Sequence, residues 1–257
     1  MKLRQKSRLR LWLFWLFGSV SLQLFSLPIY AGDAANVRVL GFSPNREYFA
    51  FEQFGVQDGS GFPYSEIFIL DTNSDAWVAG SPVRVLIKDE TKTIDEARDS
   101  SAQQAAGLLS RLKISIPPVI LVSNPLTEIS FNDSVIRFTL RPNMQGNRQY
   151  GIYHLILKQT KLENSVCGKF GVTPSIIDLS LYGPGELAKS GLQLLKDTQL
   201  PKSRGCPLDY RVSEVLISPE TDEKTRTLVV LLSVFSLGFE GADRRFIAIT
   251  RRFEPEW

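Results

Sequence analysis

Short runs of alternating apolar and polar residues recur along most of the chain, and they constrain its fold more than any other feature. The runs are rich in β-branched and aromatic residues, and Pro, Gly, Asn or Asp separates them. They occupy residues 37–42, 48–54, 66–70, 83–87, 119–122, 135–140, 150–157, 176–181, 211–217, 227–235 and 246–253. Alternation with a period of two is typical of strands with one face buried. The sequence therefore predicts a mainly β protein with short-stranded antiparallel sheets, arranged as a sandwich or like a propeller; an α+β fold is the alternative.

One amphipathic helix is also indicated, between the fourth and fifth runs. Thr93 and Glu96 have the spacing of a capping box, and Pro117 with Pro118 prevents any continuation. The apolar residues of this segment fall on one stripe: Ile94, Ala97, Ala105, Leu108, Leu109 and Leu112. A second, weaker helix is expected over residues 186–196.

The N-terminus has the three regions of a secretory signal peptide. Five cations within residues 2–10 precede the apolar LWLFWLFGSV, and Pro28 leads to the small Ala31. The sequence predicts a signal peptide over residues 1–31, cleaved after Ala31, and a single β-rich exported domain over residues 32–257. The alternative is an uncleaved anchor, since the weaker apolar run 11–27 nearly reaches the length that a bilayer requires. After cleavage we expect no stable membrane span, and a secreted or periplasmic location.

Removal of the signal peptide changes the charge of the protein. The whole chain has 30 Lys and Arg against 27 Asp and Glu, and cleavage removes five cations and no acid. The mature chain then has 25 cations against 27 acids, a net charge near −2. No positive field remains to attract nucleic acid, so nucleic acid is not an expected partner.

Cys167 and Cys206 are the only cysteines of the chain. In an exported protein two thiols are expected to be joined, because the compartment is oxidising and no other partner exists. Free thiols and a catalytic or metal-binding pair are the alternatives. Neither is favoured, since the chain has no C-x-x-C motif and a single histidine.

Three short motifs invite a functional interpretation, and each has a structural one. GPGELA, from Gly183 to Ala188, has the form of a dinucleotide loop, but it lacks a surrounding βαβ pattern and also suits a simple turn. DTNSD, from Asp71 to Asp75, spaces its oxygens like a calcium loop but lacks the required glycine and terminal glutamate. His154, in a predicted strand, has no accompanying nucleophile motif. We therefore expect no cofactor, no metal and no catalytic residue from these motifs.

A carboxylate pair is the remaining enzymatic possibility, since two acids from distant strands can meet across a cleft. The acids in the most distinctive segments are Glu52, Asp58, Glu66, Glu240 and Asp243. Capping of turns and solvation of strand ends are the favoured explanation for each of them. The glycines around them, Gly55, Gly59, Gly61, Gly238 and Gly241, are expected to provide the positive φ that loops require.

Similar strand-turn-strand patterns begin at Phe42, Phe131 and Ile217, and their spacing suggests a degenerate repeat of one unit. Chance similarity between strands is the alternative. The first unit, Gly41 to Asp71, resembles the blade motif of exported β-propellers similar to the TolB protein.

Three further segments, QDGSGFPYSEIFILD, LPKSRGCPLDYRV and GFEGADRRFIA, resemble a family of predicted secreted bacterial proteins of unknown function. The resemblance implies export and a single domain, with no established activity. We therefore expect a binding or interaction module of the cell envelope or extracellular space, with an unknown protein or polymer as its partner. A carboxylate-dependent hydrolase acting on such a polymer is the alternative.

The export signal gives the first testable prediction. Mass spectrometry of the protein made in its native host should find a mature chain that begins at Gly32. Retention of residues 1–31 on most molecules would contradict it.

Overall fold

Strand β12 (Arg226–Leu237) lies at the centre of the fold and is buried on both faces. A computed structural model describes residues 32–125, 134–140, 151–221, 224–239 and 241–255 of the chain. Side chains at Leu228, Val230 and Leu232 point to one face, and those at Val229 and Leu231 point to the other. Each of these five residues is at most 1 % exposed. This explains why the run TLVVLLSVF is almost continuously apolar.

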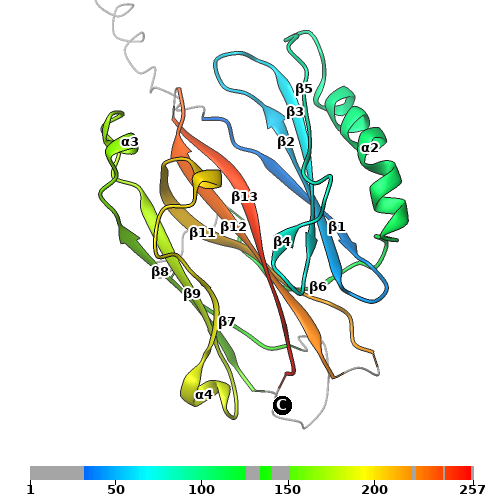
Figure 1. The fold of residues 1–257 in the computed structure, drawn as a ribbon, viewed down its shortest axis with the longest axis vertical. Helices are drawn as coiled ribbons and strands as arrows, with labels where there is room; N and C mark the ends of the chain where they lie inside the picture. Colours follow the sequence, from blue (N-terminus) through cyan, green and yellow to red (C-terminus); the bar gives the residue numbers. More distant parts are fainter. Residues whose placement is uncertain (1–31, 126–133, 141–150, 222–223, 240, 256–257) are drawn as a thin grey trace, which may run out of the picture. The chain divides into compact units, whose positions relative to one another are not determined.

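The sheet that contains β12, here the central sheet, is antiparallel and has four strands. Their order in the sheet is β13 (Ala242–Phe253), β12, β11 (Pro207–Ile217) and β6 (Val119–Ser123). In Figure 1 strands β11, β12 and β13 run through the middle of the picture, and the strands of the other two sheets lie on either side of them.

A second antiparallel sheet, here the helix-covered sheet, packs on one face of the central sheet. It contains β1 (Asn36–Phe42), β2 (Tyr48–Val56), β3 (Pro63–Asp71), β4 (Ala76–Trp77) and β5 (Val83–Leu86). Its inward side chains are aromatic. The Phe49 ring stacks on that of Phe51 and lies tilted against that of Phe42, and all three pack with Val229 and Leu231 of β12.

Helix α2 (Ile94–Arg111) covers the outer face of this sheet (Figure 1). Its N-terminus is the expected capping box: the Glu96 N–H donates to the Thr93 hydroxyl, and the Glu96 carboxylate accepts from the Thr93 N–H. Small residues at Ala97, Ser101 and Ala105 are buried and let the helix lie close to the strands. The predicted helix is thus confirmed.

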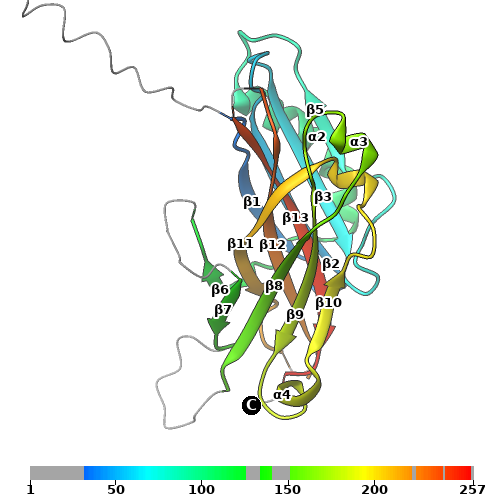
Figure 2. The same cartoon turned by 90° about the vertical axis from the view of Figure 1, so that its left-hand side faces the viewer.

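The third sheet, here the outer sheet, packs on the opposite face of the central sheet. Its strands pair in the order β10 (Leu192–Lys196), β9 (Ser175–Tyr182), β8 (Tyr153–Lys161) and β7 (Val135–Phe138). Figure 2 shows β8, β9 and β10 in front of the central strands. The protein is therefore mainly β, as predicted, and its three antiparallel sheets are stacked as in a sandwich.

The second predicted helix is largely wrong. Only α4 (Leu187–Ser190) is helical, and the rest of the segment forms strand β10. Gly191 ends the helix with a φ of 65°, where the ring of Tyr182 leaves no room for a side chain. Leu192 and Leu195 then pack into the core between the outer and central sheets. Burial in a sheet outweighed the helical periodicity of this segment.

The predicted threefold repeat is also wrong. The segments after Phe42 and Ile217 each lead from one strand to its antiparallel neighbour, β1 to β2 and β11 to β12. The middle start, Phe131, lies outside the described residues. The strands around it, β6 and β7, belong to the central and outer sheets and do not form one hairpin.

The structure joins Cys167 to Cys206, with a sulfur–sulfur distance of 2.07 Å and Cα atoms 5.6 Å apart. Cys167 lies in α3 (Ser165–Gly168), a single turn capped by the side chain of Asn164. Cys206 directly precedes β11 and follows a short 3-10 turn, Lys202–Arg204. The bond thus ties the segment between β8 and β9 to the start of a central strand.

Replacement of both cysteines by serine should lower the free energy of unfolding by about 3 to 4 kcal/mol, because the cross-link limits the unfolded chain. Chemical denaturation of the two forms measures this difference. Ligand binding should be retained at a temperature where the variant stays folded. Two free thiols in the unfolded, unreduced wild-type protein would contradict the pairing.

Candidate functional site

The chain crosses from one sheet to another close to its described beginning. Residues Asp33 to Ala35 lie along the edge of β13 as a short parallel strand: the Ala35 N–H donates to the Arg244 carbonyl, and the Arg244 N–H to that of Asp33. From Asn36 onward the chain forms β1 and pairs with β2 instead. Beyond this crossing the edge of β13 has no neighbouring strand among the described residues.

A cleft of about 620 Å³ opens beside this free edge. Its volume is in the usual range for ligand sites. One wall is the helix-covered sheet and the other is the segment between β10 and β11, with β13 between them. Polar, aromatic and apolar residues line the cleft, among them Gln53, Glu66, Phe68, Asp75, Trp77, Arg84, Leu195, Arg204, Phe246 and Ala248.

An exposed aromatic and cationic surface forms the wall on the helix-covered sheet. Trp77 is 47 % exposed, and its ring lies 5.8 Å from that of Phe68. The Arg84 guanidinium lies 5.6 Å from the Trp77 ring and 5.9 Å from the Phe68 ring. Glu66 holds this guanidinium through an ion pair of 2.8 Å. Exposed Trp and Arg side chains of this kind are typical of binding surfaces.

Two side chains from the helix-covered sheet bind the free edge of β13. Gln53 accepts a hydrogen bond of 2.7 Å from the Phe246 N–H and donates one of 2.5 Å to Glu66. Asp75 accepts from both the N–H and the hydroxyl of Thr250, at 2.7 and 2.9 Å. These bonds attach the edge of the central sheet to the neighbouring sheet at two points.

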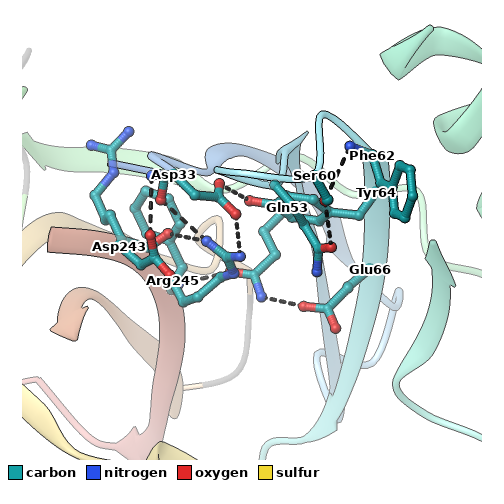
Figure 3. Close-up of polar contacts among 11 residues, drawn as sticks. Asp33, Gln53, Ser60, Phe62, Tyr64, Glu66, Asp243 and Arg245 are labelled. Atoms are coloured by element: carbon teal, nitrogen blue, oxygen red, sulfur yellow. Dashed lines mark hydrogen bonds and ion pairs between the residues drawn. The ribbon is translucent and has the colours of Figure 1, made fainter. Parts of the chain in front are cut away.

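A buried polar network adjoins the cleft, which Arg245 lines (Figure 3). Asp33, whose side chain is 2 % exposed, accepts hydrogen bonds from Tyr64 at 2.9 Å and Arg245 at 2.5 Å. The Arg245 guanidinium also lies over the Tyr64 ring, 4.6 Å from its centre. Asp243 accepts from the Asp33 N–H. Burial, assisted by the Asp33 carboxylate, raises the pKa of Tyr64, so this hydroxyl remains a donor.

Gly55 fits this network because it lies directly opposite Tyr64 in the sheet, where a side chain would come within 2.9 Å of the Tyr64 hydroxyl. It therefore lies in a strand and not in a loop with positive φ. Of the other predicted glycines, Gly59 and Gly61 have positive φ, whereas Gly238 does not.

The acids singled out in the sequence do not form a catalytic pair among the described residues. Glu66 lines the cleft, but Glu52 lies on the opposite face of the same sheet, where it binds Arg98 of α2 through two hydrogen bonds. Asp243 belongs to the polar network and Asp58 to the turn between β2 and β3. Glu240 lies outside the described residues.

The short motifs of the sequence serve turns and strands. Asp71 accepts hydrogen bonds from the N–H groups of Asn73 and Ser74, as in a tight turn, and Asp75 points toward β13. GPGELA links β9 to α4. Its first residue, Gly183, lies so close to the Tyr153 ring that a side chain there would clash with it. His154 is partly buried in β8. No group of three or more potential metal ligands is found within the described part of the chain.

The sequence did not single out most of the residues that build this site. Gln53, Trp77 and Arg84 come from three strands that only the fold brings to one wall. Asp33 and Arg245 are 212 positions apart. Of these five residues, Arg245 alone could have been noticed in the sequence, as one of two adjacent arginines in the distinctive segment GFEGADRRFIA.

Comparison with known proteins identifies the family. A family model described as "Predicted secreted protein (DUF2259)" matches residues 50–252, most of the described fold. The chain belongs to the DUF2259 family. No curated protein and no solved structure shows significant similarity to it. The resemblance to DUF2259 proteins is thereby confirmed, whereas the resemblance to TolB-like blades is not. As a DUF2259 protein, the chain is a predicted secreted protein of unknown function, and none of its described helices could span a membrane.

The role of Asp75 can be tested by pH and substitution. Burial raises the pKa of Asp75 in the folded protein, although the bonds from Thr250 act in the opposite direction. Its contribution to stability is therefore fully present below the unfolded pKa of about 3.9 and declines as the pH rises toward the folded pKa. Asp75→Asn keeps the acceptor and removes the charge, so its unfolding free energy at pH 7 should equal or exceed that of the wild type.

Asp75→Ala is the matched control, and it should lose about 1 to 3 kcal/mol because the Thr250 N–H and hydroxyl are left unpaired. Chemical denaturation of the three proteins at pH 4 and pH 7 measures both effects. If both variants lose the same free energy of unfolding at pH 7, the side-chain oxygen at position 75 that accepts from Thr250 is unimportant.

Proposed function

We propose that this DUF2259 protein is a binding module of the cell envelope or extracellular space, that its signal peptide is removed after Ala31, and that the cleft beside β13 is its ligand site. The observation that carries the proposal is the wall formed by Trp77, Phe68 and Arg84. It places a half-exposed tryptophan and a guanidinium fixed by Glu66 along the cleft. Fixed aromatic and arginine side chains contribute most of the energy in many binding sites.

Binding is favoured over hydrolysis because both carboxylates of the cleft already have partners. Glu66 binds Arg84 and Gln53, and Asp75 binds the backbone and side chain of Thr250. A glycoside hydrolase needs one carboxyl group that delivers a proton and a second that attacks the sugar or activates water. In either role, Glu66 would give up its bonds to Arg84 and Gln53, and Asp75 would give up the bonds to Thr250 that join the two sheets.

The test is capture of envelope components by the tagged full chain, produced in a host that exports it. Trp77→Ala should weaken retention of the captured component about 30-fold, since loss of a central aromatic residue typically costs about 2 kcal/mol. Phe170→Ala is the matched control, because Phe170 is 67 % exposed but does not line the cleft.

If the wild type and Trp77→Ala retain the captured component equally, the cleft is not the ligand site. Release of soluble fragments from the envelope polymer during incubation would favour the hydrolase instead.

A further inference from the structure

We propose that the ligand of the cleft is an extended peptide segment that adds to the edge of β13 as an additional strand, paired with Ala248. This inference rests on the proposed function and specifies the chemistry of its ligand. The directions of the hydrogen-bonding groups of β13 are fixed by the pairing of this strand with β12.

The register of the two strands shows which groups of β13 face the cleft. Every second residue of β13 has its N–H and carbonyl directed away from β12; these residues are Arg244, Phe246, Ala248 and Thr250, opposite Phe235, Ser233, Leu231 and Val229. This orientation is observed directly for three of them, because their N–H groups donate to Asp33, Gln53 and Asp75. Since the pattern alternates along a strand, the N–H and carbonyl of Ala248 must point the same way.

Ala248 is the one position in this series to which the described residues offer no partner on the cleft side. Gln53 satisfies Phe246 on one side of it, and Asp75 satisfies Thr250 on the other. Ala248 is partly exposed and lines the cleft. Its small side chain leaves room beside the backbone. Proteins commonly block an exposed strand edge against unwanted pairing. Here side chains block the N–H groups of Phe246 and Thr250, and they leave that of Ala248 between them unblocked.

The fold already contains the interaction that we propose. Residues 33–35 pair with this same edge at Arg244, four positions before Ala248, and then leave to form β1. An incoming peptide would continue the strand position that the chain vacates. In the parallel pattern of residues 33–35, one residue of the peptide would accept from the Ala248 N–H, and the residue two positions later would donate its N–H to the Ala248 carbonyl, as Asp33 and Ala35 do at Arg244.

The walls of the cleft suit the alternating side chains of a strand better than a saccharide. Side chains on one face of an added strand would meet Phe68 and Trp77, and those on the other would meet Leu195 and Arg204. An unpaired backbone N–H and carbonyl on one residue are complementary to a peptide bond in extended conformation. The three cleft arginines already bind Glu66, Asp197 and Asp33, so the ligand needs no net negative charge.

The experiment uses the full chain from an exporting host and end-blocked random heptapeptides displayed on phage as the probe. In the free protein, the Ala248 amide should exchange hydrogen much faster than its neighbours Ile247 and Ile249, whose amides pair with β12. A selected peptide should slow exchange at Ala248 at least tenfold. N-methylation of the one peptide nitrogen that faces Ala248 should weaken binding at least tenfold, and N-methylation of the next nitrogen less than threefold.

Ala248→Pro provides a second test, because it removes the N–H that faces the cleft and leaves the hydrogen bonds to β12 intact. It should weaken binding of the selected peptides at least tenfold, with Ala248→Gly as the control that retains the N–H. If the proline variant does not fold, the exchange and N-methylation measurements on the wild type still decide the matter.

Strand addition is overturned if no selected peptide slows exchange at Ala248, or if N-methylation weakens binding equally at adjacent positions. The proposed function fails separately. If Trp77→Ala reduces envelope capture while no peptide protects Ala248, the cleft binds a ligand of other chemistry. If Trp77→Ala has no effect either, both proposals fall.

Discussion

Strand β12 is buried on both faces, and this burial holds the three sheets together. Its alternating leucines and valines form part of two separate cores, one with the outer sheet and one with the helix-covered sheet. Full burial of each such side chain contributes about 1.5 to 3 kcal/mol. Because these contributions fall on both sides of one strand, loss of its packing would expose two sheets together. The outer and helix-covered sheets are thus stabilised through a strand that belongs to neither of them.

The same arrangement creates the cleft. The central sheet ends at β13, and the chain segment that begins to extend it, Asp33 to Ala35, departs to form β1. The edge that it leaves is held to the helix-covered sheet by Gln53 and Asp75, through side chains instead of strand pairing. Polar side chains at such positions are costly to bury unless they are satisfied. Both of them are satisfied here, and the space between them remains open to a ligand.

The sequence predicted the strands and the long helix well because their signals are local. Alternation marks β2 and β12, and the capping box of Thr93 and Glu96 marks α2. It failed at β10, where a helical spacing of leucines was outweighed by pairing with β9. The site could not be predicted from the sequence, because it also depends on contacts between distant segments. Its walls come from separate strands and the 3-10 turn, and no local pattern shows which strands become neighbours or where an edge stays open.

If the three sheets are stabilised as one unit through β12, they should unfold together. Native-state hydrogen exchange across a denaturant series can show this, because it measures the opening free energy of each amide. The slowly exchanging amides of β2, β8 and β12 should then share one free energy of opening, equal to that of global unfolding. Exchange of the β8 amides through a smaller opening, with β2 and β12 still protected, would show that the outer sheet unfolds independently and would contradict the claim.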